Sequence, residues 1–122
     1  MRGERGSASI AAAGAAAIAL ALSLLVADMG RVLVVTSRAQ TAADAAALAA
    51  AHEMALPTGA DPAALAAEYA SRNGATLSSC NCPPGAFEAS VAVEVPVGDL
   101  LLVPGERSAV AEARAVVQLP SP

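Results

Sequence analysis

The longest hydrophobic pattern in the chain is an uncharged run from Gly6 to Ala27, which follows Arg5 and is closed by Asp28. At about 1.5 Å per residue, the apolar stretch from Ala8 to Ala27 would form a helix of roughly 30 Å, which matches the hydrocarbon core of a bilayer. The pattern therefore predicts a single-pass transmembrane helix over residues 8–27, in contact with membrane lipid.

A signal peptide and a buried core helix are the two alternatives to a membrane anchor for this run. A secretory signal peptide also begins with basic residues, but its apolar region usually spans about 7 to 15 residues and ends at a small-x-small site. Here the run is longer, and Leu25 stands where Ala27 would need a small partner. A buried core helix is the second alternative, although 122 residues offer little protein to surround a helix that is apolar on all sides.

The charges near the span predict its orientation. Arg2, Arg5 and the α-amino group precede it, although Glu4 lies among them and Arg31 and Arg38 follow on the other side. The positive-inside bias is small and places the N-terminus in the cytoplasm. The expected organisation is a cytoplasmic N-terminus at 1–7, a transmembrane helix at 8–27 and an extracytoplasmic α+β domain at 28–122.

The helical pattern continues beyond the predicted span. The segment from Arg31 to Leu56 contains no proline and is rich in strong helix formers, and Pro57 is the first clear break. The cluster from Val32 to Thr36 is β-branched and compatible with a strand, but its position favours a continuous helix. We expect one long helix, flexed at Gly30, that projects from the membrane.

A short second helix is predicted after Asp61. Aspartate supplies an N-cap oxygen, and Pro62 suits the first helical turn. Asn73 and Gly74 provide a C-terminal stop about three turns later. We expect this helix to pack on the first helix or on a sheet.

The period then changes to that of strands. Phe87–Val95 alternates β-branched residues with small or polar ones after the turn Cys82–Gly85, and Val110–Leu119 reads as the last strand. The apolar run Leu100–Val103 is compatible with a strand, a short helix or a contact with the membrane surface. The expected fold class is α+β: a long helix, a short second helix and a small antiparallel sheet of three or four strands.

Charge and chemistry narrow the function. From Asp28 onward, five arginines face ten acidic residues, which disfavours nucleic acid as a partner. His52 is the sole histidine and fits a solvated side chain better than a general base, and Glu53 beside it fits a surface charge. No catalytic residue, metal ligand, cofactor or small-molecule substrate is predicted, so we expect a protein that is not an enzyme.

Both cysteines lie in the motif Cys80-Asn81-Cys82. Outside the cytoplasm they can oxidise to each other, or each can pair with a cysteine of another chain. Two free thiols in a surface turn are the alternative, and a metal site would lack ligands because His52 is the one plausible third donor.

Asp44 interrupts the alanine-rich segment Ala42–Ala51. The simplest interpretation is a solvent-facing residue that keeps the helix soluble. Alternatively, alanine faces let helices approach closely, and Asp44 fixes their register by pairing with Arg38 of a neighbouring subunit. We take Gln40, Asp44 and Leu48 as the candidates for helix packing and register.

Several of these segments together resemble a known family. Arg5–Ile10 before a single span, followed by Arg38–Ala51, is similar to the N-terminal region of TadE/TadG-like proteins of the tight-adherence (Flp) pilus systems. Tyr69-Ala70 with Asn73-Gly74, followed by strands, is similar to what comes next in that group. The short, TadE-like form fits 122 residues better than TadG-like members with a large C-terminal domain.

The resemblance implies a minor pilin-like component of pilus assembly or secretion in a bacterial cell membrane, with other pilus or secretion-apparatus subunits as partners. Prepilin-type processing usually needs glutamate five residues beyond the cleaved glycine, and after Gly6 that position is Ala11, so cleavage there is not carried over. Two alternatives stay open: a membrane-tethered binding module that uses the turn Cys80–Gly85, and thiol chemistry at Cys80 and Cys82.

Overall fold

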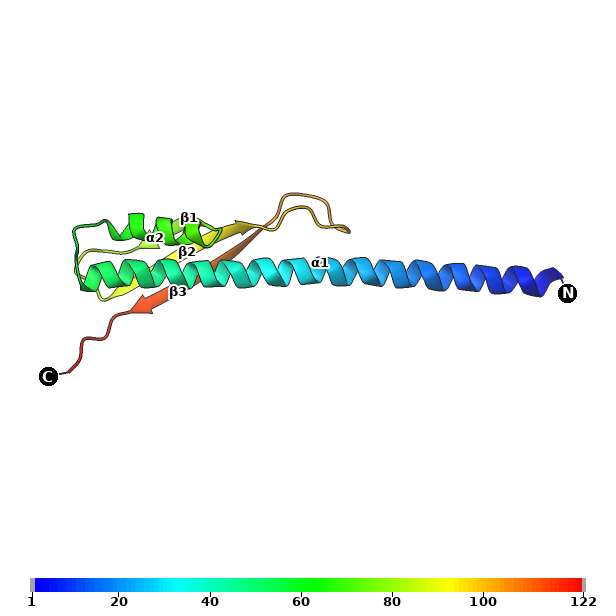
Figure 1. The fold of residues 1–122 in the computed structure, drawn as a ribbon, viewed down its shortest axis with the longest axis horizontal. Helices are drawn as coiled ribbons and strands as arrows, with labels where there is room; N and C mark the ends of the chain where they lie inside the picture. The colour runs from blue at the N-terminus through cyan, green and yellow to red at the C-terminus, as the bar shows by residue number, and fades with distance from the viewer. Residues whose placement is uncertain (1, 122) are drawn as a thin grey trace.

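The computed structural model describes residues 2–121, which form two helices followed by three strands (Figure 1). Met1 of the predicted cytoplasmic segment and Pro122 of the predicted extracytoplasmic domain lie outside the described residues. The elements are α1 (Arg2–Ala55), α2 (Pro62–Arg72), β1 (Thr76–Asn81), β2 (Glu88–Pro96) and β3 (Ser108–Val116). The predicted α+β class, with a long apolar helix before a short helix and a sheet, is confirmed.

Helix α1 is continuous over 54 residues, a length of about 80 Å. It includes the β-branched cluster Val32–Thr36, as predicted, and passes through Gly30 without a break, so the expected flexure at Gly30 is wrong (Figure 1). Glycine weakens a helix, but the residues on both sides of Gly30 continue the hydrogen-bonded ladder, and no other element approaches it within 4 Å.

The ends of α2 follow the predicted capping signals. The Asp61 carboxylate accepts from the Ala63 N–H at 3.3 Å, and Pro62 occupies the first turn. At the other end, Asn73 is the C-cap, and Gly74 adopts a φ of 75°, a conformation that glycine takes without strain. The Ala75 N–H donates to the Ala70 carbonyl at 2.9 Å, which closes the helix.

The three strands form one antiparallel sheet in the order β1-β2-β3. β2 and β3 pair without interruption from Glu88↔Val116 to Pro96↔Ser108, whereas the β1–β2 register shifts between Leu77 and Ser79. The predicted alternation in the last strand is confirmed, since Ala111 faces inward while Glu112 and Arg114 are on the more open side. β1, for which the sequence suggested no bounds, contains Cys80.

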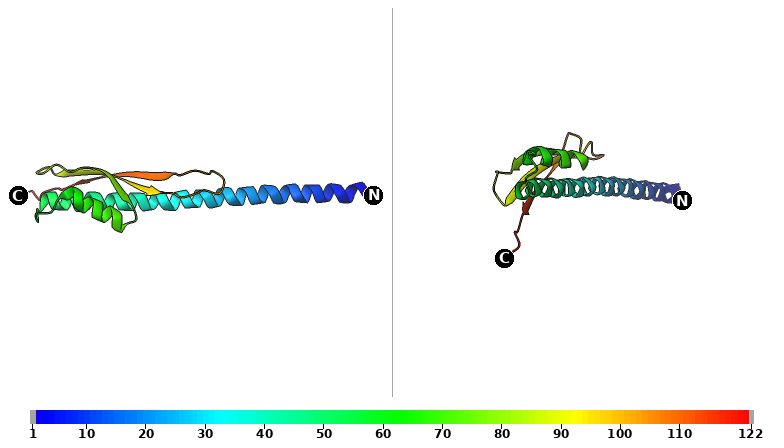
Figure 2. Two further views of the ribbon diagram at one scale, coloured as in Figure 1. Left: turned by 90° about the horizontal axis from the view of Figure 1, so that it is seen from above. Right: turned by 60° about the vertical axis from the view of Figure 1, so that its left-hand side comes forward.

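The sheet lies along the C-terminal half of α1, with α2 beside it (Figures 1 and 2). α1 packs against α2, β2 and β3, and α2 packs against β1. The largest group of core side chains consists of alanines of α1, which recur every three or four residues and meet alanines of α2 and valines of β2. The largest fully buried side chain is Val93. We call residues 35–121, which build this packed unit, the head.

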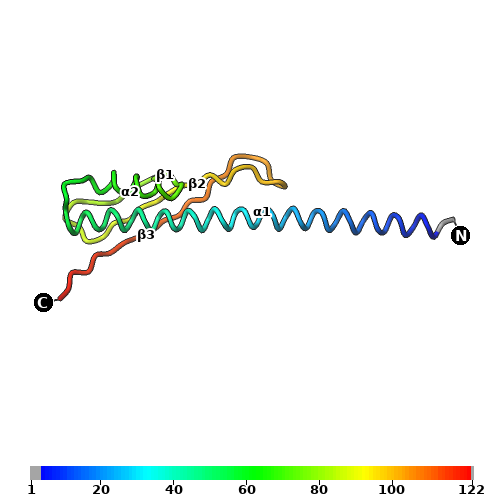
Figure 3. The backbone as a smooth tube through the Cα atoms, viewed as in Figure 1, coloured from blue at the N-terminus to red at the C-terminus, as the bar shows by residue number. Residues whose placement is uncertain are grey.

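The N-terminal half of α1 extends from the head with no other element around it (Figures 1 and 3). Its most apolar 18-residue window has a mean hydropathy of 2.4 and is 0 % buried, so the helix is long and apolar enough to cross a membrane. Large apolar side chains such as Ile18, Leu22 and Val26 are exposed. Within the described residues, the run is therefore not buried as a core helix would be.

Residues 97–107 connect β2 to β3 as a loop that we call the β2–β3 loop. Leu100–Val103, at its tip, forms neither a strand nor a helix. The loop reaches back along α1 toward its N-terminal half (Figure 1), where it meets Asp28.

Candidate functional site: the exposed face of α1 and its buried carboxylates

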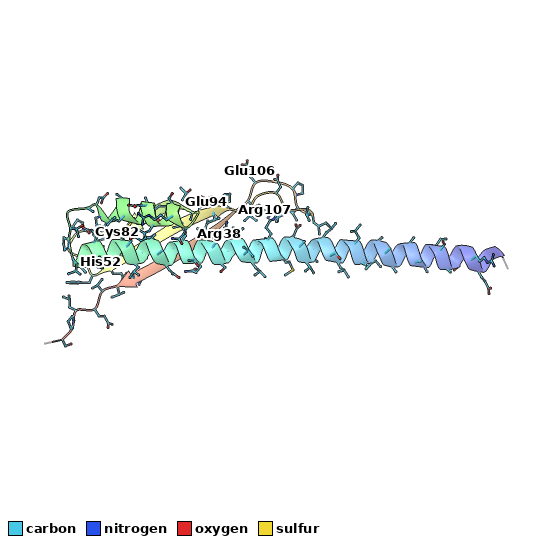
Figure 4. All side chains as sticks on the ribbon, in the orientation of Figure 1. Arg38, His52, Cys82, Glu94, Glu106 and Arg107 are labelled. Atoms are coloured by element: carbon cyan, nitrogen blue, oxygen red, sulfur yellow. A yellow bond between two sulfur atoms is a disulfide. The ribbon has the colours of Figure 1, made fainter. Side chains whose placement is uncertain are left out.

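Gln40, Asp44 and Leu48 lie four residues apart and form one exposed stripe on α1. The Gln40 Nε2 donates to Asp44 Oδ1 at 3.0 Å and to the Glu112 carbonyl at 3.4 Å. Gln40 therefore lies where α1 meets β3, and it orients the Asp44 carboxylate on the open surface. Among the described residues, Asp44 forms no ion pair with Arg38 of the same chain, and both side chains are exposed (Figure 4 labels Arg38).

Leu48 also borders an apolar groove between α1 and α2. The groove has a volume of about 450 Å³, and its lining residues are Ala45, Leu48, Ala49, His52, Leu65 and Tyr69. The Leu48 side chain is 66 % exposed, which is high for a leucine on a helix that packs in a head. The stripe and the groove together make one continuous surface of a carboxylate, an amide and apolar side chains.

Glu53 is not the surface charge that the sequence suggested. Its side chain is 4 % exposed, because the chain turns over it after α1 ends at Ala55. The Thr58 hydroxyl donates to Oε2 at 2.8 Å, and the N–H groups of Thr58, Gly59 and Ala60 donate to Oε1 at 2.6, 3.0 and 3.0 Å. The carboxylate thereby satisfies three consecutive backbone N–H groups of the α1–α2 turn.

These hydrogen bonds lower the pKa of Glu53 below its ordinary value of 4.5. The Thr58 side-chain hydroxyl has the largest effect, burial opposes it, and the backbone N–H groups of Thr58, Ala60 and Gly59 add to the lowering. Glu53 is therefore ionised at neutral pH and has a structural role.

Asp28 is the second buried carboxylate of α1, at 6 % exposure. Oδ1 accepts from the Leu101 N–H and Oδ2 from the Leu102 N–H, both at 2.8 Å. Three residues further on, Arg31 Nη1 donates to the Asp99 carbonyl at 2.5 Å. Asp28 lies seven residues before Val35, two helical turns away, and so on the face of α1 that carries the head. The β2–β3 loop is thus bound to the helix at the end of the uncharged run.

The comparison with protein families finds a similarity in the N-terminal part of the chain. A family model described as "Putative Flp pilus-assembly TadE/G-like" matches the chain over residues 6–53. The N-terminal part of the chain is therefore similar to TadE/G-like proteins. The resemblance noted in the sequence is therefore confirmed for this segment, which covers less than half of the chain.

The matched segment lies within α1. It starts at the first residue of the uncharged run, includes the alanine stripe that forms the floor of the head, and ends at Glu53, whose carboxylate holds the following turn. The description of the matched model names Flp pilus assembly. No curated protein and no solved structure matches the chain significantly.

Beyond the TadE/G-like segment, the two cysteines lie at the end of β1. The structure joins Cys80 to Cys82 by a disulfide with a Cα–Cα distance of 5.5 Å (Figure 4 labels Cys82). The motif therefore begins in a strand, whereas the sequence placed it in or beside a turn. Cys80 pairs with Val91 of β2, so the bridge lies at the outer edge of the sheet.

His52 is exposed on the rim of the groove beside Leu48 (Figure 4 labels His52). Within residues 2–121, no three side chains of histidine, cysteine, aspartate or glutamate gather closely enough to hold a metal ion.

Sequence reasoning missed the roles of Asp28 and Glu53. For Glu53 a signal was present, because Thr58 and Gly59 follow the end of α1 and their N–H groups need an acceptor. For Asp28 no local signal exists, since its partners are 73 and 74 residues away.

Proposed function

We propose that this protein is a membrane-anchored, minor pilin-like structural component of a bacterial Tad (Flp) pilus assembly or a related secretion system. The observation that carries this proposal is the division of one 54-residue helix into two halves. The N-terminal half is apolar and exposed, and the C-terminal half packs against the sheet and α2 in a small α+β head. Such a subunit can be anchored in the bilayer by the N-terminal half of α1 and contact neighbouring subunits through the C-terminal half.

The proposed topology has residues 8–27 across the membrane, the N-terminus in the cytoplasm and residues 28–122 outside. The arginines before the span support this orientation. A head outside the cytoplasm also suits a disulfide, because that compartment is oxidising. We propose that Cys80 and Cys82 are bonded to each other there, and the 5.5 Å Cα–Cα distance lies within the usual range for disulfides.

The proposed assembly surface is the stripe Gln40, Asp44 and Leu48 with the adjoining groove. Exposed leucine beside small alanines lets a second helix approach closely, and a carboxylate oriented by Gln40 can pair with Arg38 of a neighbouring subunit. Membrane lipid and other pilus or secretion-apparatus subunits are the proposed partners, and nothing in the site favours a nucleic acid or a small-molecule substrate.

Fractionation with intact-mass analysis tests the anchor. The full-length chain, expressed with its natural neighbours, should be found in the membrane fraction with residues 6–27 still attached. A soluble product that begins after Ala27 would show a cleaved signal peptide and contradict the anchor.

Co-purification tests the assembly role. The detergent-extracted protein should carry other pilus subunits with it, and deletion of its gene should reduce surface filaments. Normal filaments in the deletion strain, together with loss of binding to an extracellular ligand, would favour a tethered binding module instead.

A further inference from the structure

The β2–β3 loop is a built structure that carries an apolar tip. The Val97 N–H donates to the Arg107 carbonyl at 2.8 Å and closes its base, while Asp28 accepts the Leu101 and Leu102 N–H groups at its tip. Arg31 adds a third link through the Asp99 carbonyl. The backbone of the tip is therefore held against α1 by hydrogen bonds at three positions within four residues.

The side chains of the tip are exposed, although its backbone is held against α1. Leu101, Leu102 and Val103 are 61 %, 44 % and 41 % exposed, although the backbone N–H groups of the two leucines point to a buried carboxylate. Three adjacent exposed apolar side chains on a fixed loop are unfavourable in water and mark a contact surface.

The position of the tip along α1 identifies what it contacts. Asp28 is the first charged residue after the uncharged run Gly6–Ala27, so it marks the end of the segment long enough to cross the bilayer. Leu25, Val26 and Met29, which are close to Asp28 along α1, are also exposed. The tip is therefore continuous with the lipid-facing surface of the helix.

Polar residues flank the tip on both sides. Asp99 precedes Leu100, and Glu106 with Arg107 follows Val103 after the turn Pro104-Gly105 (Figure 4 labels Glu106 and Arg107). A short apolar segment between charged flanks suits the boundary between acyl chains and headgroups, where the apolar side chains are buried and the charges stay hydrated.

We infer that the β2–β3 loop inserts Leu101, Leu102 and Val103 into the interfacial layer of the bilayer, and that Asp28 holds the loop in this position. The head is then fixed to the membrane at two places, α1 and the loop. This inference rests on the proposed anchoring of residues 8–27.

Single-tryptophan variants test the inference cleanly, because the natural chain contains no tryptophan. The full-length protein is reconstituted in phosphatidylethanolamine and phosphatidylglycerol vesicles, with and without lipids brominated on the acyl chains. Leu101→Trp and, separately, Leu102→Trp should show blue-shifted emission and quenching by the brominated lipids. Leu48→Trp, on the exposed stripe of the head, is the matched control and should not be quenched by the brominated lipids.

Ile18→Trp separates the failure of the inference from the failure of the anchor. If Ile18→Trp is quenched by brominated lipid while both loop variants behave as Leu48→Trp does, the loop inference is overturned and the anchor stands. If Ile18→Trp is not quenched, the anchor itself fails, and the inference with it. If the emission of a loop tryptophan shifts to the blue only when other pilus subunits are added, and lipid alone has no effect, the tip contacts a protein partner. That result would also overturn the inference.

The role of Asp28 has its own test in the same vesicles. Asp28→Ala, combined with Leu101→Trp, should shift the loop from the docked to the free state by about tenfold or more, because two hydrogen bonds to a charged acceptor are lost. Quenching at position 101 should fall while quenching at position 18 is unchanged, and Asp28→Asn, which retains one acceptor oxygen, should restore part of it. Unchanged quenching at position 101 in Asp28→Ala would contradict the role of Asp28.

Discussion

The two halves of α1 are both apolar and rich in alanine, yet they are built for different surroundings. In the N-terminal half, leucine, isoleucine and valine are exposed all around the helix, and no charge interrupts residues 6–27. In the C-terminal half, alanines such as Ala39, Ala46 and Ala50 form one fully buried stripe, and the exposed face carries polar side chains such as Gln40 and Asp44 together with Leu48. The distribution of side chains around the helix, rather than its mean hydropathy, therefore distinguishes a lipid-facing half from a protein-facing half.

A charge in the middle of the N-terminal half should have the largest effect on this comparison. Ile18→Arg places a cation near the bilayer centre, where it costs about 3 kcal/mol of insertion free energy. We expect most of the protein to be lost from the membrane fraction on alkaline extraction. The matched control is Thr41→Arg, at an exposed position of the other half, which should extract as the natural protein does. Equal extraction of the two variants would remove the difference between the halves.

The same substitution in both halves should have opposite outcomes. Ala46→Leu enlarges a side chain that is 0 % exposed beneath the sheet and should lower the free energy of unfolding of the head by about 1 to 3 kcal/mol. Ala16→Leu adds the same atoms on a lipid-facing surface and should leave the head unchanged. Thermal unfolding of the full-length protein in detergent measures the stability of the head in both variants. The loss of the β-sheet signal in circular dichroism follows the unfolding. A tolerated Ala46→Leu would mean that the stripe is looser than its burial indicates.

The two buried carboxylates of α1 extend the comparison of its halves. Asp28 holds the β2–β3 loop, and Glu53 holds the α1–α2 turn. Since the pKa of Glu53 in the folded state lies below its ordinary value of 4.5, its contribution to stability is present above that value. It is lost as the pH falls through the lower, folded-state pKa. Glu53→Gln should therefore lower the unfolding temperature at pH 7 and flatten its dependence on pH below about 4.5.

Glu68→Gln is the control for this prediction. Glu68 pairs with Arg72 on the surface of α2, where an exposed ion pair contributes little. An equal loss of pH dependence in the two variants would assign the acid sensitivity of the head to carboxylates in general rather than to Glu53.

The smallest expected effect on the isolated subunit is that of Asp44→Ala. Asp44 is exposed and accepts one hydrogen bond, from Gln40, so the unfolding free energy should change by no more than about 0.5 kcal/mol. Incorporation into an assembly with other subunits should fall, because the proposed partner of Arg38 is lost. Full incorporation of Asp44→Ala would leave Asp44 as a solubilising residue.

The parts of this fold that could be predicted from the sequence are those with local signals. The uncharged run, the cap at Asp61 with Pro62 and the alternation in β2 each lie within one element, and the structure has a helix or a strand at each. β1 could not be given bounds, because Thr76–Asn81 is mostly polar and its register shifts next to Leu77. The conformation of Leu100–Val103 depends on Asp28, more than 70 residues away, and no local pattern encodes that contact.

The candidate site shows the same limit. The sequence drew attention to Asp44 because a charge stood out among alanines, and the structure places it on an exposed stripe with Gln40 and Leu48. It assigned Glu53 to the surface because the turn that closes over this carboxylate is visible only in three dimensions. Isolated polar residues in an apolar helix can thus be found from sequence, but their partners cannot.

A scan of spin labels along α1 tests the central claim most directly. Single cysteines are introduced between positions 8 and 54 in a Cys80→Ser, Cys82→Ser background, and the full-length protein is reconstituted in vesicles. Accessibility to oxygen and to a water-soluble nickel complex is then measured at each position. We predict oxygen access without nickel access on every face of residues 8–27, and from residue 35 onward nickel access that alternates with the helical period and is lowest at the alanine stripe. Nickel access at the middle of residues 8–27, or helical periodicity of burial there, would contradict the division of α1 into a lipid-facing and a protein-facing half.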